Sequence, residues 1–458
     1  VDSPFDKVKY KALLDGLEVI EINFSEVLND NNIRFEAEFY NSKTGLNDNF
    51  FYGKDIIDFV QYGTSNELNE DNLGYPILRL NEFDSNFIGI PSKYCNSITQ
   101  DIFENLRLLK NDVLICRTNG NPKYVGKSAI VMKDTQFAND SYLFKIRPKK
   151  EKINSSTLTI FLNSKYGRQE IEKYSMVSNQ ANFSPAKFKE IKIPIFSNTF
   201  QLEIETFVKT SYQKLEDSKN LYKEAESLLL KELDLVDFTP KNENIAIKSF
   251  KDSFMQTGRL DSEYYQAKYD ELIDHIKKAN FDKLDNIVNI KKSIEPGSEA
   301  YQDSGIPFIR VSNVTKFGIS DTDIYLSRNI LKEEELQKLY PTKDTILLSK
   351  DGTVGIAYKI KNETEMITSG ALLHLMIKRG DVLPEYLTLV LNSLIVQLQA
   401  QRDAGGSIIQ HWKPSEIQEI LIPIIDISVQ KQIEEKIKKS FLLKEESKRL
   451  LDLAKKAV

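Results

Sequence analysis

The feature that most constrains this 458-residue chain is an internal repeat. Residues 158–225 align with residues 387–454 without a gap, so that LTIFLNS at 158–164 falls on LTLVLNS at 387–393. The spacing of the copies is far longer than the roughly 20–50 residues of a solenoid repeat. The repeat therefore predicts one globular module followed by one helix, duplicated in tandem. Such a chain presents two similar surfaces to a target that itself has two parts.

Composition is that of an ordinary globular protein, with 41% hydrophobic and 28% charged residues. The length allows roughly two to four domains. No apolar run reaches about 18 residues and the first residues lack a signal-peptide stretch, so we expect no membrane span. Cys95 and Cys116 are the only cysteines, and neither has a matching cysteine in the other copy. This usage favours a cytoplasmic location and argues against a structural zinc site.

Charge is unevenly distributed along the chain. The net charge of −5 argues mildly against stand-alone nucleic-acid binding. Residues 15–75 hold thirteen acidic and three basic side chains, whereas residues 107–150 hold ten basic and three acidic. The basic stretch suits a phosphate-facing surface and equally a solvated lysine face, and composition alone leaves both interpretations open.

Both copies repeat one order of segments: an amphipathic opening segment, a strand introduced by Gly and Pro, and a second strand closed by a glycine turn. These segments cover 33–43, 74–82 and 110–120 in the first copy and 258–268, 305–313 and 342–352 in the second. The first copy carries three extra residues before Val125, and such differences map to loops. Arg79 and Arg310 occupy the same place in the first strand, which suits a phosphate contact or, preferably, a structural ion pair.

An aromatic residue stands two positions before a proline in both copies, at Phe183 and Trp412. With proline at the first helical position, the aromatic side chain can pack on the apolar residue five positions later, Phe188 or Ile417. Trp412, the only tryptophan, is therefore interpreted as a helix-entry staple rather than a platform for base stacking.

A long polar helix with a narrow apolar seam follows each module. Its buried positions alternate at four and three residues, the spacing of a coiled coil. The predicted helix-pairing residues are Ile204, Val208, Leu215, Tyr222 and Leu229 in the first copy and Ile433, Ile437 and Leu451 in the second. Each helix needs one close partner, and the simplest partner is the other helix of the same chain, running antiparallel.

The predicted fold is of the α/β (α+β) class, with two tandem globular domains separated by two long antiparallel coiled-coil helices and related by a pseudo-two-fold duplication. The predicted bounds are 1–200 for the first domain, 201–238 for the first helix, 239–428 for the second domain and 429–458 for the second helix. A helix of about 35 residues spans roughly 50 Å. That length exceeds the ~34 Å of one turn of B-DNA, a natural distance between half-sites.

Motifs for catalysis are missing. The sequence has no phosphate-binding P-loop, no G-x-S-x-G nucleophile elbow and no H-E-x-x-H zinc motif, and its three histidines have no metal-ligand spacing. Glu190 and Lys192 show the E-x-K spacing of metal-dependent nucleases, but the second copy has Leu421 in place of the lysine. We therefore expect a chain that binds rather than catalyses.

The repeated motifs resemble those of the specificity subunits of type I restriction–modification enzymes. The likeness rests on G-x-P-x-x-R at 74–79 and 305–310, on S-x-D-G-x-x-G at 349–355, and on an I-P strand followed by Gln201 or Gln430. The likeness covers essentially the whole chain and occurs twice.

The resemblance implies a non-enzymatic DNA reader. Each globular domain would be a target-recognition domain for one half of a split, asymmetric sequence in double-stranded DNA. The helices would dock two methyltransferase subunits that modify an adenine in each half, and restriction subunits with ATP-driven translocation would join them. The chain itself would bind no cofactor, because the methyl donor, Mg and ATP would belong to the partner subunits. No membrane partner is implied.

The candidate base-reading residues lie in loops at matched places where the two copies differ. Arginine is the commonest reader of guanine, and asparagine or glutamine of adenine. In the first copy the candidates are Arg117, Asn119, Asn121, Lys123, Tyr124, Asn179, Gln180 and Asn182. In the second copy they are Lys350, Asp351, Thr353, Ile408, Gln410 and His411.

Three alternatives remain open at this point. The chain could be the DNA-recognition module of another class of restriction–methylation enzyme. It could be a scaffold whose helices and domains bind only proteins. It could also be a nuclease built on Glu190 and Lys192, the least favoured of the three.

Overall fold

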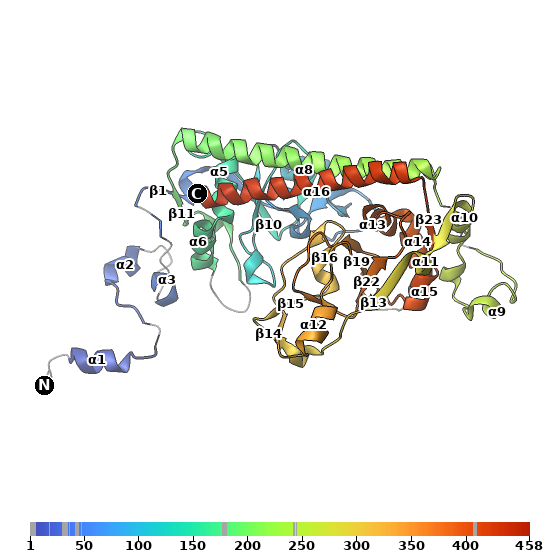
Figure 1. The fold of residues 1–458 in the computed structure, drawn as a ribbon. Coiled ribbons are helices and arrows are strands. Elements are labelled where there is room, and N and C mark those ends of the chain that lie inside the picture. The colour runs from blue at the N-terminus through green and yellow to red at the C-terminus, as the bar shows by residue number, and fades with distance from the viewer. Residues whose placement is uncertain are drawn as a thin grey trace. The chain divides into compact units, whose positions relative to one another are not determined.

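The computed structural model describes residues 6–458 apart from 18, 30–34, 36, 42–44, 47, 176–180, 241–242, 244 and 406–409. The chain divides into two compact units (Figure 1). Unit 1 comprises residues 1–216 and 444–458, and unit 2 comprises residues 217–443. Each unit thus contains one mixed domain and a part of both long helices.

Unit 1 is built around a six-stranded sheet in the order β2-β10-β7-β8-β5-β4. Its strands are β2 (Ile57–Tyr62), β10 (Leu143–Pro148), β7 (Val113–Cys116), β8 (Ser128–Ile130), β5 (Phe87–Ile88) and β4 (Phe83–Asp84). Smaller sheets join β6 (Lys93–Cys95), β3 (Tyr75–Leu78) and β9 (Ala138–Asn139), and β1 (Phe50–Tyr52) with β11 (Lys192–Pro194). The helices are α1 (Lys7–Leu13), α2 (Phe24–Asn29), α3 (Ala37–Asn41), α4 (Gln100–Leu106), α5 (Ser155–Asn163), α6 (Lys165–Ser175) and α7 (Pro185–Phe188).

Unit 2 has a four-stranded sheet in the order β13-β22-β19-β20. Its strands are β13 (Val288–Lys292), β22 (Leu372–Ile377), β19 (Ile346–Ser349) and β20 (Ala357–Lys359). Other sheets join β14 (Tyr301–Gln302), β18 (Tyr325–Leu326), β15 (Ile306–Ile309) and β21 (Ile367–Thr368); β12 (Phe281–Lys283) and β23 (Leu421–Pro423); and β16 (Val314–Thr315) and β17 (Gly318–Ile319). The helices are α9 (Phe254–Thr257), the 3-10 turn η4 (Ser262–Tyr265), α10 (Ala267–Ile276), α11 (Leu284–Ile287), α12 (Glu333–Leu339), α13 (Pro384–Asn392), α14 (Leu394–Asp403) and α15 (Pro414–Gln418).

The two units share one topology. The order β2-β10-β7-β8 in unit 1 matches β13-β22-β19-β20 in unit 2, and the pair β1-β11 matches β12-β23. A parallel pairing of Ile77 with Ala138 also recurs as Phe308 with Ile367. The predicted mixture of helices and strands, duplicated in tandem, is therefore confirmed.

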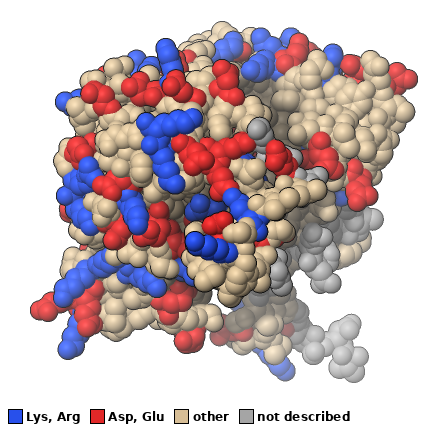
Figure 2. All heavy atoms as spheres, turned by 90° about the vertical axis from the view of Figure 1, so that its right-hand side faces the viewer, with Lys and Arg blue, Asp and Glu red and all other residues tan. Residues whose placement is uncertain are grey.

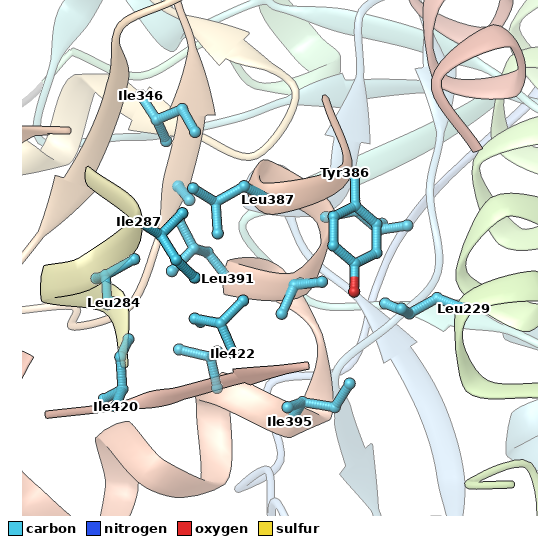
Figure 3. Close-up of a cluster of buried hydrophobic side chains, with 14 of the residues drawn as sticks. Leu229, Leu284, Ile287, Ile346, Tyr386, Leu387, Leu391, Ile395, Ile420 and Ile422 are labelled. Atoms are coloured by element: carbon cyan, nitrogen blue, oxygen red, sulfur yellow. The ribbon is translucent and has the colours of Figure 1, made fainter. Parts of the chain in front are cut away.

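Apolar helices seal one face of each sheet. In unit 2, Leu387 and Leu391 of α13 lie against Ile287, Ile346 and Ile422 (Figure 3), and all are buried. In unit 1, Leu158 and Phe161 of α5 join the corresponding core, and both are fully buried. The runs LTIFLN and LTLVLN are thus repeated because each must cover the same sheet.

The long helices α8 (Asn198–Glu232) and α16 (Ile427–Ala457) pair through small residues in each unit. In unit 1 the hydroxyl oxygens of Ser211 and Ser447 lie 2.8 Å apart, and in unit 2 those of Ser218 and Ser440 lie 3.1 Å apart. A later residue of α8 thus meets an earlier residue of α16, so the helices are antiparallel, as predicted. The predicted pairing residues are all buried: Ile204, Val208, Leu215, Tyr222, Leu229, Ile433, Ile437 and Leu451.

The first long helix is shorter at its C-terminus than the predicted range 201–238. It begins at Asn198 and ends at Glu232. Asp234 adopts a left-handed conformation with φ 52°, and the Leu235 N–H donates to the carbonyl of Leu230 at 2.7 Å. This is a Schellman cap formed without glycine, the residue that usually marks such a cap in a sequence. It turns Leu233 and Leu235 into the core of unit 2. The second helix, predicted over 429–458, spans Ile427–Ala457.

In the described part of the chain, every helix is too short or too polar to cross a membrane.

Candidate nucleic-acid interface

In each unit, two loops that are far apart in sequence meet at one place. The Phe183 N–H donates to the Arg117 carbonyl at 2.7 Å in unit 1, and the Trp412 N–H donates to the Lys350 carbonyl at 2.7 Å in unit 2. Isolated β-bridges beside these bonds join Thr118 to Asn182 and Asp351 to His411. The structure thus brings together the described members of the two groups of candidate residues in each unit. We call each such place a reading site: 117–124 with 182 in unit 1, and 350–353 with 410–411 in unit 2.

A buried aromatic residue anchors the second loop of each reading site. Phe183 and Phe188 are fully buried with ring centroids 6.4 Å apart, and Ser184 between them caps α7 by accepting from the Lys187 N–H. Trp412 is 1% exposed and Ile417 is fully buried. This burial agrees with the staple interpretation and leaves no face of Trp412 for a DNA base.

Arg117 is a cation positioned by an aromatic ring. Its guanidinium carbon lies 5.3 Å from the centroid of the Tyr62 ring, a cation–π contact. Among the residues that the structure describes, its buried Nε has no hydrogen-bond partner. A fixed guanidinium with unused donors is suited to two hydrogen bonds with guanine.

The neighbouring asparagines of unit 1 shape the turn. The side-chain oxygen of Asn119 accepts from the Asn121 N–H at 2.9 Å, and that of Asn121 accepts from the Lys123 N–H at 3.0 Å. Lys123 is exposed, and Tyr124 is 43% exposed. The Asn182 carbonyl accepts from Lys187 Nζ at 2.9 Å. The candidates Asn179 and Gln180 lie outside the described residues.

Unit 2 places a different set of groups at the same position. Lys350 forms an ion pair with Asp351, whose other carboxylate oxygen lies 2.9 Å from His411 Nδ1. The Gly352 N–H donates to the Gln410 carbonyl at 2.9 Å, and the exposed Thr353 accepts through its carbonyl from Ser349 Oγ at 2.6 Å. Ile408 lies outside the described residues. Unit 2 thus offers a Lys–Asp–His network where unit 1 offers an arginine on an aromatic ring.

Cations gather beside the reading site of unit 1. Arg168 donates to the carbonyls of Val125 at 2.7 Å and Lys123 at 3.3 Å, which fixes the turn. Burial, and secondly the charge of Lys455, lowers the pKa of Lys127 below its ordinary value. Burial also lowers the pKa of Lys455. Lys127, from the basic range 107–150, is thus joined at this place by Arg168 and Lys455 from other parts of the chain. By contrast, acidic and basic side chains are interspersed on the face drawn in Figure 2.

The matched arginines of the first strand differ between the units. Arg79 lies 3.5 Å from the Glu82 carboxylate, which also accepts from Ser92 Oγ at 2.6 Å. The predicted structural ion pair is therefore present in unit 1. Arg310 is exposed, and Asn313 stands in place of the glutamate. The two arginines therefore have different surroundings, and a phosphate contact by Arg310 stays a prediction.

No model of a protein family matches the chain. The chain is similar to specificity subunits of type I restriction–modification systems. The match to the S subunit from M. genitalium covers 90% of this chain and 96% of that subunit, at 15% identity and a TM-score of 0.39. The match to the HsdS subunit from Thermoanaerobacter tengcongensis covers 89% of this chain and 94% of that subunit, at 15% identity and a TM-score of 0.28.

One curated relative shares 30% identity with this chain over 146 residues, which is 31% of this chain. It is a putative type I restriction enzyme MjaX specificity subunit from Methanocaldococcus jannaschii. The matched part of the chain spans about a third of that relative's length, 34%. The curated relative is thus of the family that the sequence motifs resemble.

Proposed function

We propose that this chain is a non-catalytic DNA-recognition subunit that reads a bipartite, asymmetric target. The observation that carries the proposal is the reading site formed twice on one scaffold with different side chains. The backbone bond from Phe183 to Arg117 recurs as that from Trp412 to Lys350, while the exposed polar groups around it change. Two half-sites of different sequence need this combination of a shared backbone and unlike side chains.

The side chains suggest which bases each unit reads. In unit 1, Arg117 would bind guanine through O6 and N7, and the amide nitrogens of Asn119 and Asn121 would meet acceptor groups. In unit 2, Asp351 would accept from the amino group of cytosine, with Lys350 and His411 holding its carboxylate in place. Lys123 and the exposed Arg310 are better suited to phosphate oxygens.

Two joined recognition domains are more selective than one. A single domain that reads three or four base pairs finds a match about every 10² base pairs, which is too often for restriction. Each wrong base costs about 1–3 kcal/mol, roughly additively, so two readers multiply their selectivities. The target should therefore be two short motifs separated by a gap of constant length that is not read.

The partners are part of the proposal. A net charge of −5 leaves this chain poorly equipped to supply phosphate affinity alone. We propose that two methyltransferase subunits dock on the paired helices and supply those contacts, together with adenine methylation. Restriction subunits would add cleavage. The methyl donor, Mg and ATP would be bound by these partners, and the cytoplasm remains the predicted location.

The experiment is a selection from a randomised library of duplex DNA by this chain in complex with its methyltransferase subunit. We expect a motif in two parts with a fixed gap, bound at least tenfold more tightly than a scrambled duplex of equal length at physiological salt. Equal binding to all duplexes would contradict the proposal and support a protein-binding scaffold. A single uninterrupted motif would contradict the assignment of one half-site to each unit.

A further inference from the structure

The opening segment of each copy has no role in the function proposed above. The sequence repeats it at 33–43 and 258–268. In unit 2 its 3-10 turn, η4, packs against α14, and in unit 1 its helix, α3, packs against α6. The helices α6 and α14 are the elements from which the second loop of each reading site departs. The opening segments therefore lie where they can hold those loops.

In unit 2 the contact is made by two arginines and one tyrosine. The guanidinium carbons of Arg259 and Arg402 lie 4.4 Å and 5.4 Å from the centroid of the Tyr264 ring. Arg402 Nε donates to the carboxylate of Asp403 at 2.7 Å. Both guanidinium groups thus lie at the C-terminal end of α14, where the helix dipole favours positive charge.

Asp403 is the last residue of α14 and is buried. Arg259 Nη1 donates to its backbone carbonyl at 3.0 Å, which satisfies one of the carbonyls that a helix end leaves without a partner. Asp261 fixes the same guanidinium by accepting from its Nε at 2.9 Å and its Nη2 at 2.6 Å. Arg259 therefore links the opening segment to the end of α14.

Unit 1 makes the same contact with other residues. Lys173 Nζ lies 4.6 Å from the centroid of the Phe39 ring, and Phe39 meets Tyr174 edge-on with ring centroids 5.4 Å apart. In the repeat, Phe39 matches Tyr264, and Lys173 with Tyr174 matches Arg402 with Asp403. A cation on an aromatic ring is thus kept at the same place although every residue has changed. Arg34, the counterpart of Arg259, lies outside the described residues.

The end of α14 is connected directly to the reading site. Two residues after Asp403, Gly405 exchanges backbone hydrogen bonds with His411 at 3.1 Å and 2.7 Å. His411 in turn contacts the carboxylate of Asp351. A shift of the last turn of α14 would therefore move His411 and Asp351, the groups proposed to face the bases.

We propose that these contacts form a helix-end clamp that positions the reading loop of unit 2. The clamp consists of Arg259, Tyr264, Arg402 and Asp403, and Phe39, Lys173 and Tyr174 are its counterparts in unit 1. Its members are positioning residues, which act on base selection through the loop and touch no base. The inference rests on the proposed function, because it concerns the accuracy with which that same site reads DNA.

The experiment compares variants of the clamp in the complex with the methyltransferase, by selection from the randomised duplex library. Tyr264→Leu is expected to reduce discrimination in the half-site read by unit 2 by about 3- to 30-fold, the range for mutations that act through a coupled network. The first half-site and the affinity for scrambled duplex should be unchanged. Arg259→Gln, which alters a partly exposed side chain, should act in the same direction and serves as a second variant if Tyr264→Leu fails to fold.

The chain supplies its own matched control. The double variant Tyr264→Phe with Arg402→Lys places the residue types of the unit 1 clamp in unit 2, so it should read the second half-site as the wild type does. The clamp would be overturned if discrimination fell equally in both half-sites. It would also be overturned if discrimination in the second half-site were unchanged in both Tyr264→Leu and Arg259→Gln. These outcomes are distinct from failure of the proposed function, in which the wild-type complex itself selects no two-part motif.

Discussion

Replacing Arg117 with alanine is expected to widen the sequence accepted in one half-site and to leave the other unchanged. The guanidinium is held 5.3 Å from the Tyr62 ring centroid, and its Nε has no hydrogen-bond partner among the described residues. Loss of a bidentate contact to guanine removes about 1–3 kcal/mol of discrimination, roughly 5- to 150-fold. Competition between duplexes that differ at single positions measures this effect.

Arg117→Lys is the matched control, because lysine is the residue at the corresponding place in unit 2. Lysine keeps the charge but lacks the planar fork needed for bidentate binding. The control should therefore retain affinity for scrambled duplex while losing most of the discrimination. A uniform fall in affinity for all duplexes in Arg117→Ala would instead identify Arg117 as a phosphate contact, and relaxation of both half-sites would contradict one reader per unit.

The second large effect concerns stability. Trp412→Ala is expected to lower the free energy of unfolding of unit 2 by about 3–5 kcal/mol, as for other buried aromatic residues. The side chain is 1% exposed within the core of that unit, and its Nε1 has no hydrogen-bond partner in the described part of the chain, so the expected loss is one of packing. Urea denaturation followed by far-ultraviolet circular dichroism measures the change without relying on the deleted fluorophore.

Trp412→Phe tests the same point with the residue that unit 1 uses, Phe183. We expect this variant to cost less than Trp412→Ala, because the smaller ring retains the staple and leaves a smaller cavity. If Trp412→Ala were as stable as the wild type but no longer bound DNA, the staple interpretation would be contradicted. That result would make Trp412 a stacking platform in spite of its burial.

The sequence predicted the features that repeat or have a period. The long helices were visible because residues such as Ile204, Val208 and Leu215 recur at coiled-coil spacing. The meeting of the two loops in each unit was anticipated only as matched positions at which the copies differ. These predictions succeeded because a helical period and an internal duplication can both be recognised within one sequence.

Contacts between distant residues were beyond such reasoning. Tyr62 beneath Arg117 comes from β2, and its placement depends on sheet register that no local pattern encodes. The pairing of His411 with Asp351 depends on two loops that are 60 residues apart. The end of α8 was misjudged because Asp234 forms a left-handed cap where glycine is usual. The clamp on Tyr264 was missed because its cations lie in different segments.

Mapping of methylated adenines in the DNA of cells that produce this chain with its methyltransferase subunit tests the central claim most directly. The account predicts modification within one motif of two unlike parts separated by a constant gap, with Arg117→Ala degrading one part only. Methylation at a single uninterrupted motif, or a pattern unchanged when this chain is removed, would contradict it.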